Sequence, residues 1–126
     1  MVNNYMVKKK NLINFLIVFL IFILDRLSKY IVLEKSNNSG ILDISLNSFL
    51  NINLVWNNGI AFGLLSFNQN IFYHSITLII ILITLLIIWF AHKSSGLEKI
   101  SFLMITGGSL GNIFDRIYYS SVIDFI

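Results

Sequence analysis

Residues 71–90 read IFYHSITLIIILITLLIIWF, and this stretch decides the fold class. It carries no formal charge except a possible one on His74. At about 1.5 Å per residue, a helix over this stretch spans about 30 Å, the thickness of a bilayer core. The sequence therefore predicts a transmembrane helix here. The alternative, a buried core helix, would need a much larger protein around it.

The composition of the whole chain agrees with a membrane protein. Of its 126 residues, 56% are hydrophobic and only 12% are charged, with a mean hydropathy of +0.80. A soluble domain carries about 25% charged residues. There is no cysteine, which excludes disulfides, thiolate zinc sites and cysteine nucleophiles. The net charge of +3 is small and dispersed, so we expect no nucleic-acid partner. The sequence shows no sign of a metal site or an organic cofactor, and we predict neither.

Two further stretches are predicted to cross the membrane. Residues 12–33 are apolar up to Leu24 and follow three lysines at 8–10. Because no small-x-small cleavage site follows them, we expect a retained helix rather than a cleaved signal peptide. Residues 100–119 are predicted to form a third helix, for which a loop is the alternative because glycine weakens a helix. Small residues let another backbone approach closely, and this helix carries Gly107, Gly108 and Gly111.

Basic residues orient these helices. Lysines precede the first helix and lie in the loop at 92–99, so both segments are expected on the cytoplasmic side. Residues 34–70 then lie outside, and their partly alternating pattern predicts short strands at the membrane surface. We therefore expect an α-helical polytopic membrane protein with three transmembrane helices. The whole chain, 1–126, is predicted to be a single domain with a small extracytoplasmic strand-rich segment and a cytoplasmic N-terminus.

Ionisable side chains in or beside membrane helices are costly, so each suggests a function or a partner. Asp25 and Lys29 are four residues apart and can pair on one helix face, although a merely interfacial ion pair is the alternative. Asn112, Asp115 and Arg116 are also predicted to share one face. There we expect Arg116 to hold the Asp115 carboxylate charged and oriented, with a capping cluster as the alternative.

Two further polar segments lie outside the predicted helices. Asp124 lies in the apolar sequence VIDFI, a setting that suits a carboxyl group to acid–base chemistry. Asn57 and Gly59 lie in WNNGIAFGLL. Taken alone, the adjacent Asn58 and Gly59 indicate a tight turn.

Four segments occur together in one order along the chain. They are DRLSK at 25–29, NNGIAFG at 57–63, GGSLGNIFDR at 107–116 and VIDF at 122–125. This set resembles the motifs of the bacterial lipoprotein signal peptidases, the signal peptidase II family of aspartic peptidases. GGxxGNxxDR is the most specific of the four, and the resemblance runs from about Asp25 to the last residue.

The resemblance implies a protease of the bacterial cytoplasmic (inner) membrane, with four helices and an extracytoplasmic strand-rich cradle. Such enzymes remove signal peptides from prolipoproteins, cutting before a cysteine that carries diacylglycerol. The implied partners are therefore these precursors and membrane lipid, and we expect a monomer. In this family two aspartates activate a water molecule at the extracytoplasmic face, and one of the two corresponds to Asp124. Two such carboxylates cannot both ionise easily, so one serves as base while the other stays protonated.

The other motif residues are implied to line or brace the site. Asn57, Gly59, Asn112, Asp115 and Arg116 would contribute to the substrate site itself. From the first helix, Asp25 and Lys29 would support the substrate pocket.

One motif of the family is not found in this sequence. The family's second catalytic aspartate lies in an F-N-x-A-D motif at the start of a fourth helix, whereas the sequence ends at Ile126. We therefore expect either a fragment of a longer enzyme or a gene that has decayed or been misread by a frameshift. Without a fourth helix, we expect the glycine face of the third helix to lose its packing partner, and melting to be broad.

Three functional hypotheses follow from the sequence. The first is an aspartic endopeptidase of the signal peptidase II type, represented by an incomplete chain. The second is a non-catalytic remnant that binds signal-peptide helices, which binding without turnover would indicate. The third is a small pore-forming membrane protein, which dye leakage from vesicles would indicate.

Overall fold

The computed structural model describes residues 2–39, 43–47, 50–59 and 70–125. The chain is mostly helical, and it contains the helices α1 (Val2–Ser39), α2 (Asn70–Lys93) and α3 (Gly96–Tyr119). The described strands are short: β1 (Asp43–Asn47), β2 (Leu50–Asn53), β3 (Val55–Asn57) and β4 (Val122–Asp124). Each predicted helical range lies within one of the three helices. The glycine-bearing segment is therefore a helix and not a loop.

The first helix is longer than the sequence predicts. It has 38 residues, and its last turns include residues 34–39, for which strands or a connection are expected from the sequence. No glycine or proline occurs between Leu33 and Gly40, so nothing in the sequence stops the helix where the apolar run ends. At about 1.5 Å per residue, α1 is about 57 Å long and exceeds a bilayer core of about 30 Å.

α2 has the length and composition of a membrane span. Within the described residues, Ile71–Lys93 is long and apolar enough to cross a bilayer, with a mean hydropathy of 2.6. Only 6% of its most apolar window is buried within the protein, and Leu78, Leu82 and Leu86 are each more than half exposed. A helix so apolar and so little buried is not the core helix of a soluble protein. The spans at 12–33 and 100–119 stay predictions.

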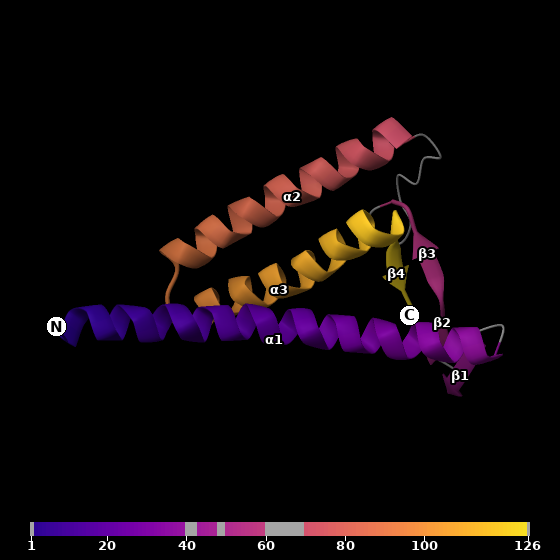
Figure 1. Cartoon of the computed structure of the whole chain (residues 1–126), viewed down its shortest axis with the longest axis horizontal. Coiled ribbons are helices and arrows are strands. Elements are labelled where there is room, and N and C mark those ends of the chain that lie inside the picture. The colour runs from indigo at the N-terminus through magenta and orange to yellow at the C-terminus, as the bar shows by residue number, and fades with distance from the viewer. Residues whose placement is uncertain (1, 40–42, 48–49, 60–69, 126) are drawn as a thin grey trace.

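α3 lies between the other two helices and packs against both (Figure 1). Its contact with α1 is close because it presents glycine there: a Cβ atom on Gly107 would lie 2.7 Å from the Cβ of Ile21 and 2.8 Å from the carbonyl oxygen of Val18. Gly111 faces Asp25 in the same way. The expectation that this glycine face lacks a partner is therefore wrong for these two positions, because α1 fills it. A Cβ atom on Gly108, in contrast, would meet no other atom within 4 Å.

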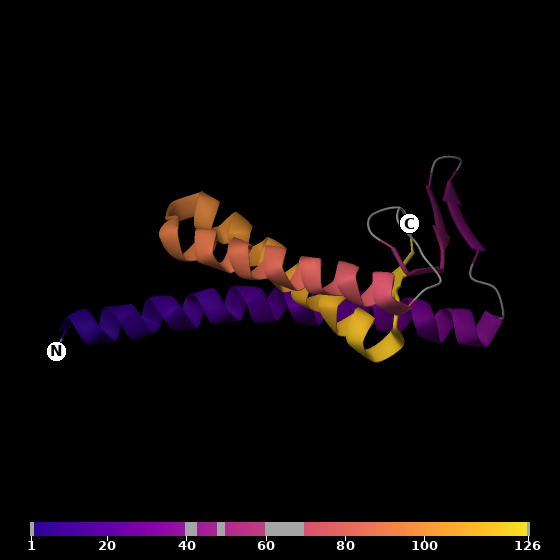
Figure 2. The ribbon, with the colours of Figure 1, turned by 90° about the horizontal axis from the view of Figure 1, so that it is seen from above.

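Two antiparallel strand pairs complete the described structure. β1 pairs with β2 as a hairpin that stands away from the helices near the end of α1 (Figure 2). β3 pairs with β4, so that Val55 lies opposite Asp124 and Asn57 lies opposite Val122. The sequence predicts short strands in the segment after the first helix, but it does not predict the strand in VIDF. This second pairing brings the end of α3 back to the segment that precedes α2.

Candidate active site

The residues that the sequence singles out gather where α3 ends and β4 begins. They form two adjoining groups, a buried ion cluster between α1 and α3 and a pocket between α2, α3 and the β3–β4 pair. All eight predicted positions belong to one group or the other: Asp25, Lys29, Asn57, Gly59, Asn112, Asp115, Arg116 and Asp124.

Asp115 is the centre of the ion cluster. It is 0% exposed, and its two carboxylate oxygens face different cations. Oδ1 accepts a hydrogen bond from Arg26 Nη1 at 2.5 Å, and Oδ2 accepts one from Lys29 Nζ at 2.6 Å. Lys29 also lies 3.1 Å from Asp25 Oδ1, the predicted i,i+4 pair, and donates to Asn112 Oδ1 at 2.8 Å. Two carboxylates thus balance two cations, as burial of charge requires.

Arg26 is the member of this cluster that sequence reasoning missed. Besides Asp115, it donates to Asp25 Oδ2 at 2.5 Å and to the carbonyl oxygen of Gly111 at 3.1 Å. Because Arg26 is one position from Asp25, it leaves the helix about 100° away from the face that Asp25 shares with Lys29. The long side chain reaches back to that face. The signal that could have found it is a third charge, beside Asp25 and Lys29, in the otherwise uncharged stretch 12–33.

Arg116 does not hold Asp115, so that prediction is wrong. Its Nη2 donates to the carbonyl oxygen of Gly59, and its guanidinium lies 5.4 Å from the ring centroid of Tyr73. Consecutive helical residues point about 100° apart, so Asp115 faces α1 while Arg116 faces α2 and β3. Tyr73, whose hydroxyl donates to the Arg116 carbonyl at 2.9 Å, had no signal in the sequence.

Two nitrogen atoms of the Arg116 guanidinium are buried without a hydrogen-bond partner in the described part of the chain. They are Nε and Nη1, and Arg116 as a whole is only 4% exposed. Buried polar groups are nearly always paired, and a guanidinium recognises carbonyl and carboxylate oxygens well. This arrangement can bind an oxygen atom of a ligand.

A pocket of about 310 Å³ opens beside Arg116. Its lining comes from β3, α2, α3 and β4, and it includes five of the eight predicted positions. The full lining is Asn57, Gly59, Ile80, Ser109, Asn112, Arg116, Val122 and Asp124. A carboxylate, a guanidinium and two amides therefore meet in one cavity.

Asn57 orients Asp124 within this pocket. Its Nδ2 donates to Asp124 Oδ2 at 2.7 Å, and its Oδ1 accepts from the backbone N–H of Gly59 at 2.8 Å. The expected turn at Asn58 and Gly59 is thus a bend closed by the Asn57 side chain, in the manner of an Asx turn. Asp124 itself is half-buried.

The ion cluster and the pocket are joined through β4. The backbone N–H of Ile123 donates to Asp115 Oδ2 at 3.4 Å, and Ile123 is 1% exposed. Asp115 thereby fixes the strand that carries Asp124. The cluster positions the pocket carboxylate and leaves Asp115 no free oxygen for chemistry of its own.

Comparison with known proteins gives a consistent result. The family model described as signal peptidase (SPase) II matches residues 17–126. The chain is 41% identical over 114 residues to the lipoprotein signal peptidase of Pelagibacter ubique (strain HTCC1062), covering 90% of this chain and 69% of that protein. It is 40% identical over 113 residues to the lipoprotein signal peptidase of Wigglesworthia glossinidia brevipalpis, covering 88% and 72%.

A solved structure is also similar. It is described as a bacterial membrane enzyme, and it superimposes with a TM-score of 0.69 at 28% sequence identity. The match covers 89% of this chain and 67% of that chain.

Proposed function

Because the chain belongs to the signal peptidase II family, a family of membrane proteases, we propose that it acts as a membrane aspartic endopeptidase on prolipoproteins. It removes the signal peptide from diacylglyceryl-modified precursors and cuts before the lipidated cysteine. The observation that carries the proposal is the Asp124 carboxylate, which Asn57 holds in a pocket beside Arg116. Two Arg116 nitrogen atoms have no hydrogen-bond partner among the described residues.

Asp124 is the residue assigned to catalysis. Asn57 occupies its Oδ2, which leaves Oδ1 to face a water molecule and the peptide carbonyl. In an aspartic peptidase a second carboxylate shares the proton, and the pair titrates as a unit. Asp115 is not that partner, because Arg26, Lys29 and the Ile123 N–H occupy its oxygens. The family resemblance implies a second catalytic aspartate, in a motif that is not found among these 126 residues.

The remaining pocket residues are assigned to binding the substrate. Arg116 Nε and Nη1 donate hydrogen bonds to a backbone carbonyl oxygen of the peptide. The side-chain amide of Asn112 lines the same pocket. Gly59 supplies the carbonyl that holds Arg116 in place. Asp25 and Lys29 act one step further away, because they brace Asp115.

The membrane arrangement is part of the same proposal. The three helices cross the cytoplasmic membrane and, with the strand-rich segment, form one monomeric domain. Basic residues gather at one end of the helices, in the first turns of α1 and around the α2–α3 connection. By the positive-inside rule that end is cytoplasmic, so the pocket with Asp124 lies at the extracytoplasmic face.

The test is cleavage of a diacylglyceryl-modified prolipoprotein by the native protein purified from its host membranes. We expect Asp124→Asn to lower the turnover rate by about 10³-fold or more, as removal of a catalytic group does, while membrane insertion is unchanged. Glu98→Gln is the matched control, since this exposed carboxylate lies at the other end of α3. Substantial turnover by Asp124→Asn would remove the catalytic role from this residue.

The intact mass of the native protein decides between a peptidase and a remnant. A mass several kilodaltons above 14.5 kDa, with a further aspartate in the C-terminal peptides, supports the complete enzyme. A mass that matches 126 residues, together with signal-peptide binding but no turnover, supports the remnant that only binds.

A further inference from the structure

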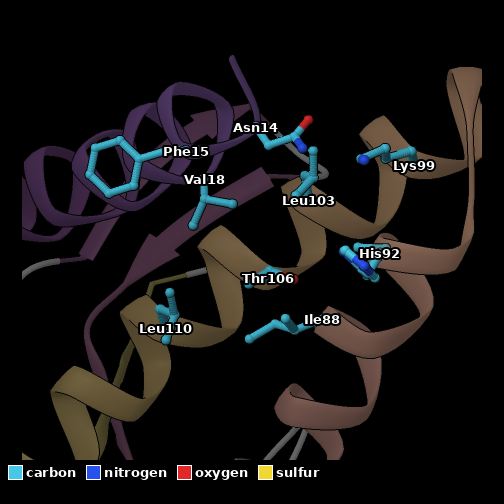
Figure 3. Close-up of a pocket in the computed structure, with 10 residues that line it drawn as sticks. Asn14, Phe15, Val18, Ile88, His92, Lys99, Leu103, Thr106 and Leu110 are labelled. Atoms are coloured by element: carbon cyan, nitrogen blue, oxygen red, sulfur yellow. The ribbon is translucent and has the colours of Figure 1, made fainter. Parts of the chain in front are cut away.

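A second pocket lies at the opposite end of the helices, where α2 turns into α3 (Figure 3). It has a volume of about 300 Å³ and takes its lining from α1, α2 and α3. The polar side chains of Asn14, His92 and Lys99 lie toward one side of it, while Phe15 and Leu110 lie toward the other. At about 1.5 Å per residue, Lys99 is about 24 Å along α3 from Asp115. The pocket is therefore separate from the candidate active site.

This pocket continues into an apolar groove between α1 and α3. The adjoining cavity of about 380 Å³ shares Phe15, Val18 and Leu110 with it and extends along α3 to Ile117. The groove is open to the surroundings, since Phe15 is 63% exposed and Ile117 is 73% exposed. The two cavities together form one continuous groove, which is basic at the end lined by His92 and Lys99 and apolar along the rest of its length.

The surroundings of the basic end carry positive charge. Residues 8–10 are exposed lysines on α1, four positions or more before Asn14, and Lys93 follows His92. Glu98 is exposed and is not among the residues that line the pocket. The field at the pocket mouth therefore favours an anion.

We propose that the basic pocket and the apolar groove together bind one anionic phospholipid of the adjacent leaflet. Lys99 and His92 donate hydrogen bonds to the phosphate oxygens, and the Asn14 side chain adds a neutral donor. An acyl chain lies along Phe15 and Leu110 toward Ile117. Basic pockets between membrane helices bind anionic headgroups in this way. A signal peptide fits the groove less well, because its N-terminal region is basic and would meet Lys99. The proposal does not depend on the peptidase function.

The test is native mass spectrometry of the full native chain in detergent, titrated separately with phosphatidylglycerol and phosphatidylcholine. We expect tighter binding of phosphatidylglycerol by the unaltered protein. Each of Lys99→Gln and His92→Gln should weaken that binding, with Lys99→Gln costing about fivefold, the share of one basic group near an anionic headgroup. Lys99→Arg should retain the preference because it keeps the charge.

Lys93→Gln is the matched control. Lys93 lies at the same membrane face, but its Nζ lies over the Trp89 ring at 5.9 Å and it does not line the pocket. We expect less than a twofold change for this variant. Equal affinity for the two lipids, or a Lys93→Gln effect as large as that of Lys99→Gln, would overturn the proposal. Displacement of phosphatidylglycerol by an equimolar synthetic signal peptide would overturn it as well, and would assign the groove to the peptide.

Discussion

Arg26 Nη1 lies 2.5 Å from Asp115 Oδ1, so that an ion pair joins α1 to α3 across 89 positions of sequence. Asp115 is fully buried, and the same carboxylate also receives Lys29 and the N–H of Ile123. One side chain thus fixes the packing of two helices and the place of the strand that bears Asp124. Loss of this pair should affect stability and activity together.

The Arg26–Asp115 pair is testable by a double-mutant cycle. Arg26→Met leaves Asp115 with one cation, and we expect a loss of about 3–5 kcal/mol in the free energy of unfolding, as for other broken buried pairs. Combining it with Asp115→Leu should cost less than the sum of the two single variants. Reversible unfolding in mixed micelles measures all three. Lys10→Met, an exposed position on the same helix, should stay within about 0.5 kcal/mol, and additive single costs would contradict the pairing.

The glycines of α3 provide a second prediction because two neighbours differ in their surroundings. A methyl group on Gly107 would collide with Ile21 and the Val18 carbonyl, so Gly107→Ala should destabilise the protein by about 1–3 kcal/mol. Gly108→Ala meets no atom within 4 Å and should be neutral or stabilising by up to about 1 kcal/mol, the helix propensity difference. The same unfolding measurement ranks the pair. An equal loss for both variants would mean that α1 does not approach Gly107 closely.

Asn57 and Asn58 form a matched pair for activity. Asn57→Ala removes the donor that holds Asp124 Oδ2 at 2.7 Å and the acceptor for the Gly59 N–H. A hydrogen bond to a charged group contributes about 1.5–3 kcal/mol, so turnover should fall by about 10- to 100-fold. Asn58→Ala changes an exposed neighbour and should leave turnover within about twofold. Prolipoprotein cleavage at saturating substrate compares them, and a larger effect at Asn58 would be inconsistent with this geometry.

Thr84 and Ser109 join α2 to α3 through hydroxyl oxygens 2.5 Å apart. Thr84→Val keeps the shape of the side chain but removes this bond, and we expect a loss of about 0.5–2 kcal/mol in unfolding free energy. Thr77→Val is the control, because the Thr77 hydroxyl donates to the Tyr73 carbonyl of its own helix. The Thr84 hydroxyl also donates to the Ile80 carbonyl at 2.8 Å. The part of the Thr84 loss that exceeds the Thr77 loss should therefore disappear in a background that already carries Ser109→Ala. Its persistence there would assign the cost to α2 alone.

Local pattern is enough to predict the helices, whereas the candidate site residues are brought together by the four motifs of the family resemblance. Apolar stretches predict where each helix lies, although α1 extends beyond its stretch at both ends. The i,i+4 spacing of Asp25 and Lys29 predicts a contact that exists at 3.1 Å. The strands after the first helix follow from partial alternation of apolar residues. Each of these predictions depends on residues within a single continuous segment, where the backbone period sets the geometry.

The errors arise where a side chain chooses between distant partners. Sequence spacing assigns Arg116 to the adjacent Asp115, but the helix turns it toward Gly59, and Arg26 takes its place. The glycine face of α3 is expected from the sequence to lack a packing partner without a fourth helix, whereas α1 packs against Gly107. The strand at 122–124 forms because β3 is available as its partner. The spacing of residues within one segment does not predict which distant segment will pack against it.

The pairing of β3 with β4 also sets the order in which this site is made. Synthesis runs from the N-terminus, so β3, with Asn57, leaves the ribosome well before β4. The partners of Asn57 and Gly59, the Asp124 carboxylate and the Arg116 guanidinium, are synthesised only after α2 and most of α3. In the nascent chain the contacts of Asn57 with Asp124 and of Gly59 with Arg116 therefore form last, when the end of α3 folds back.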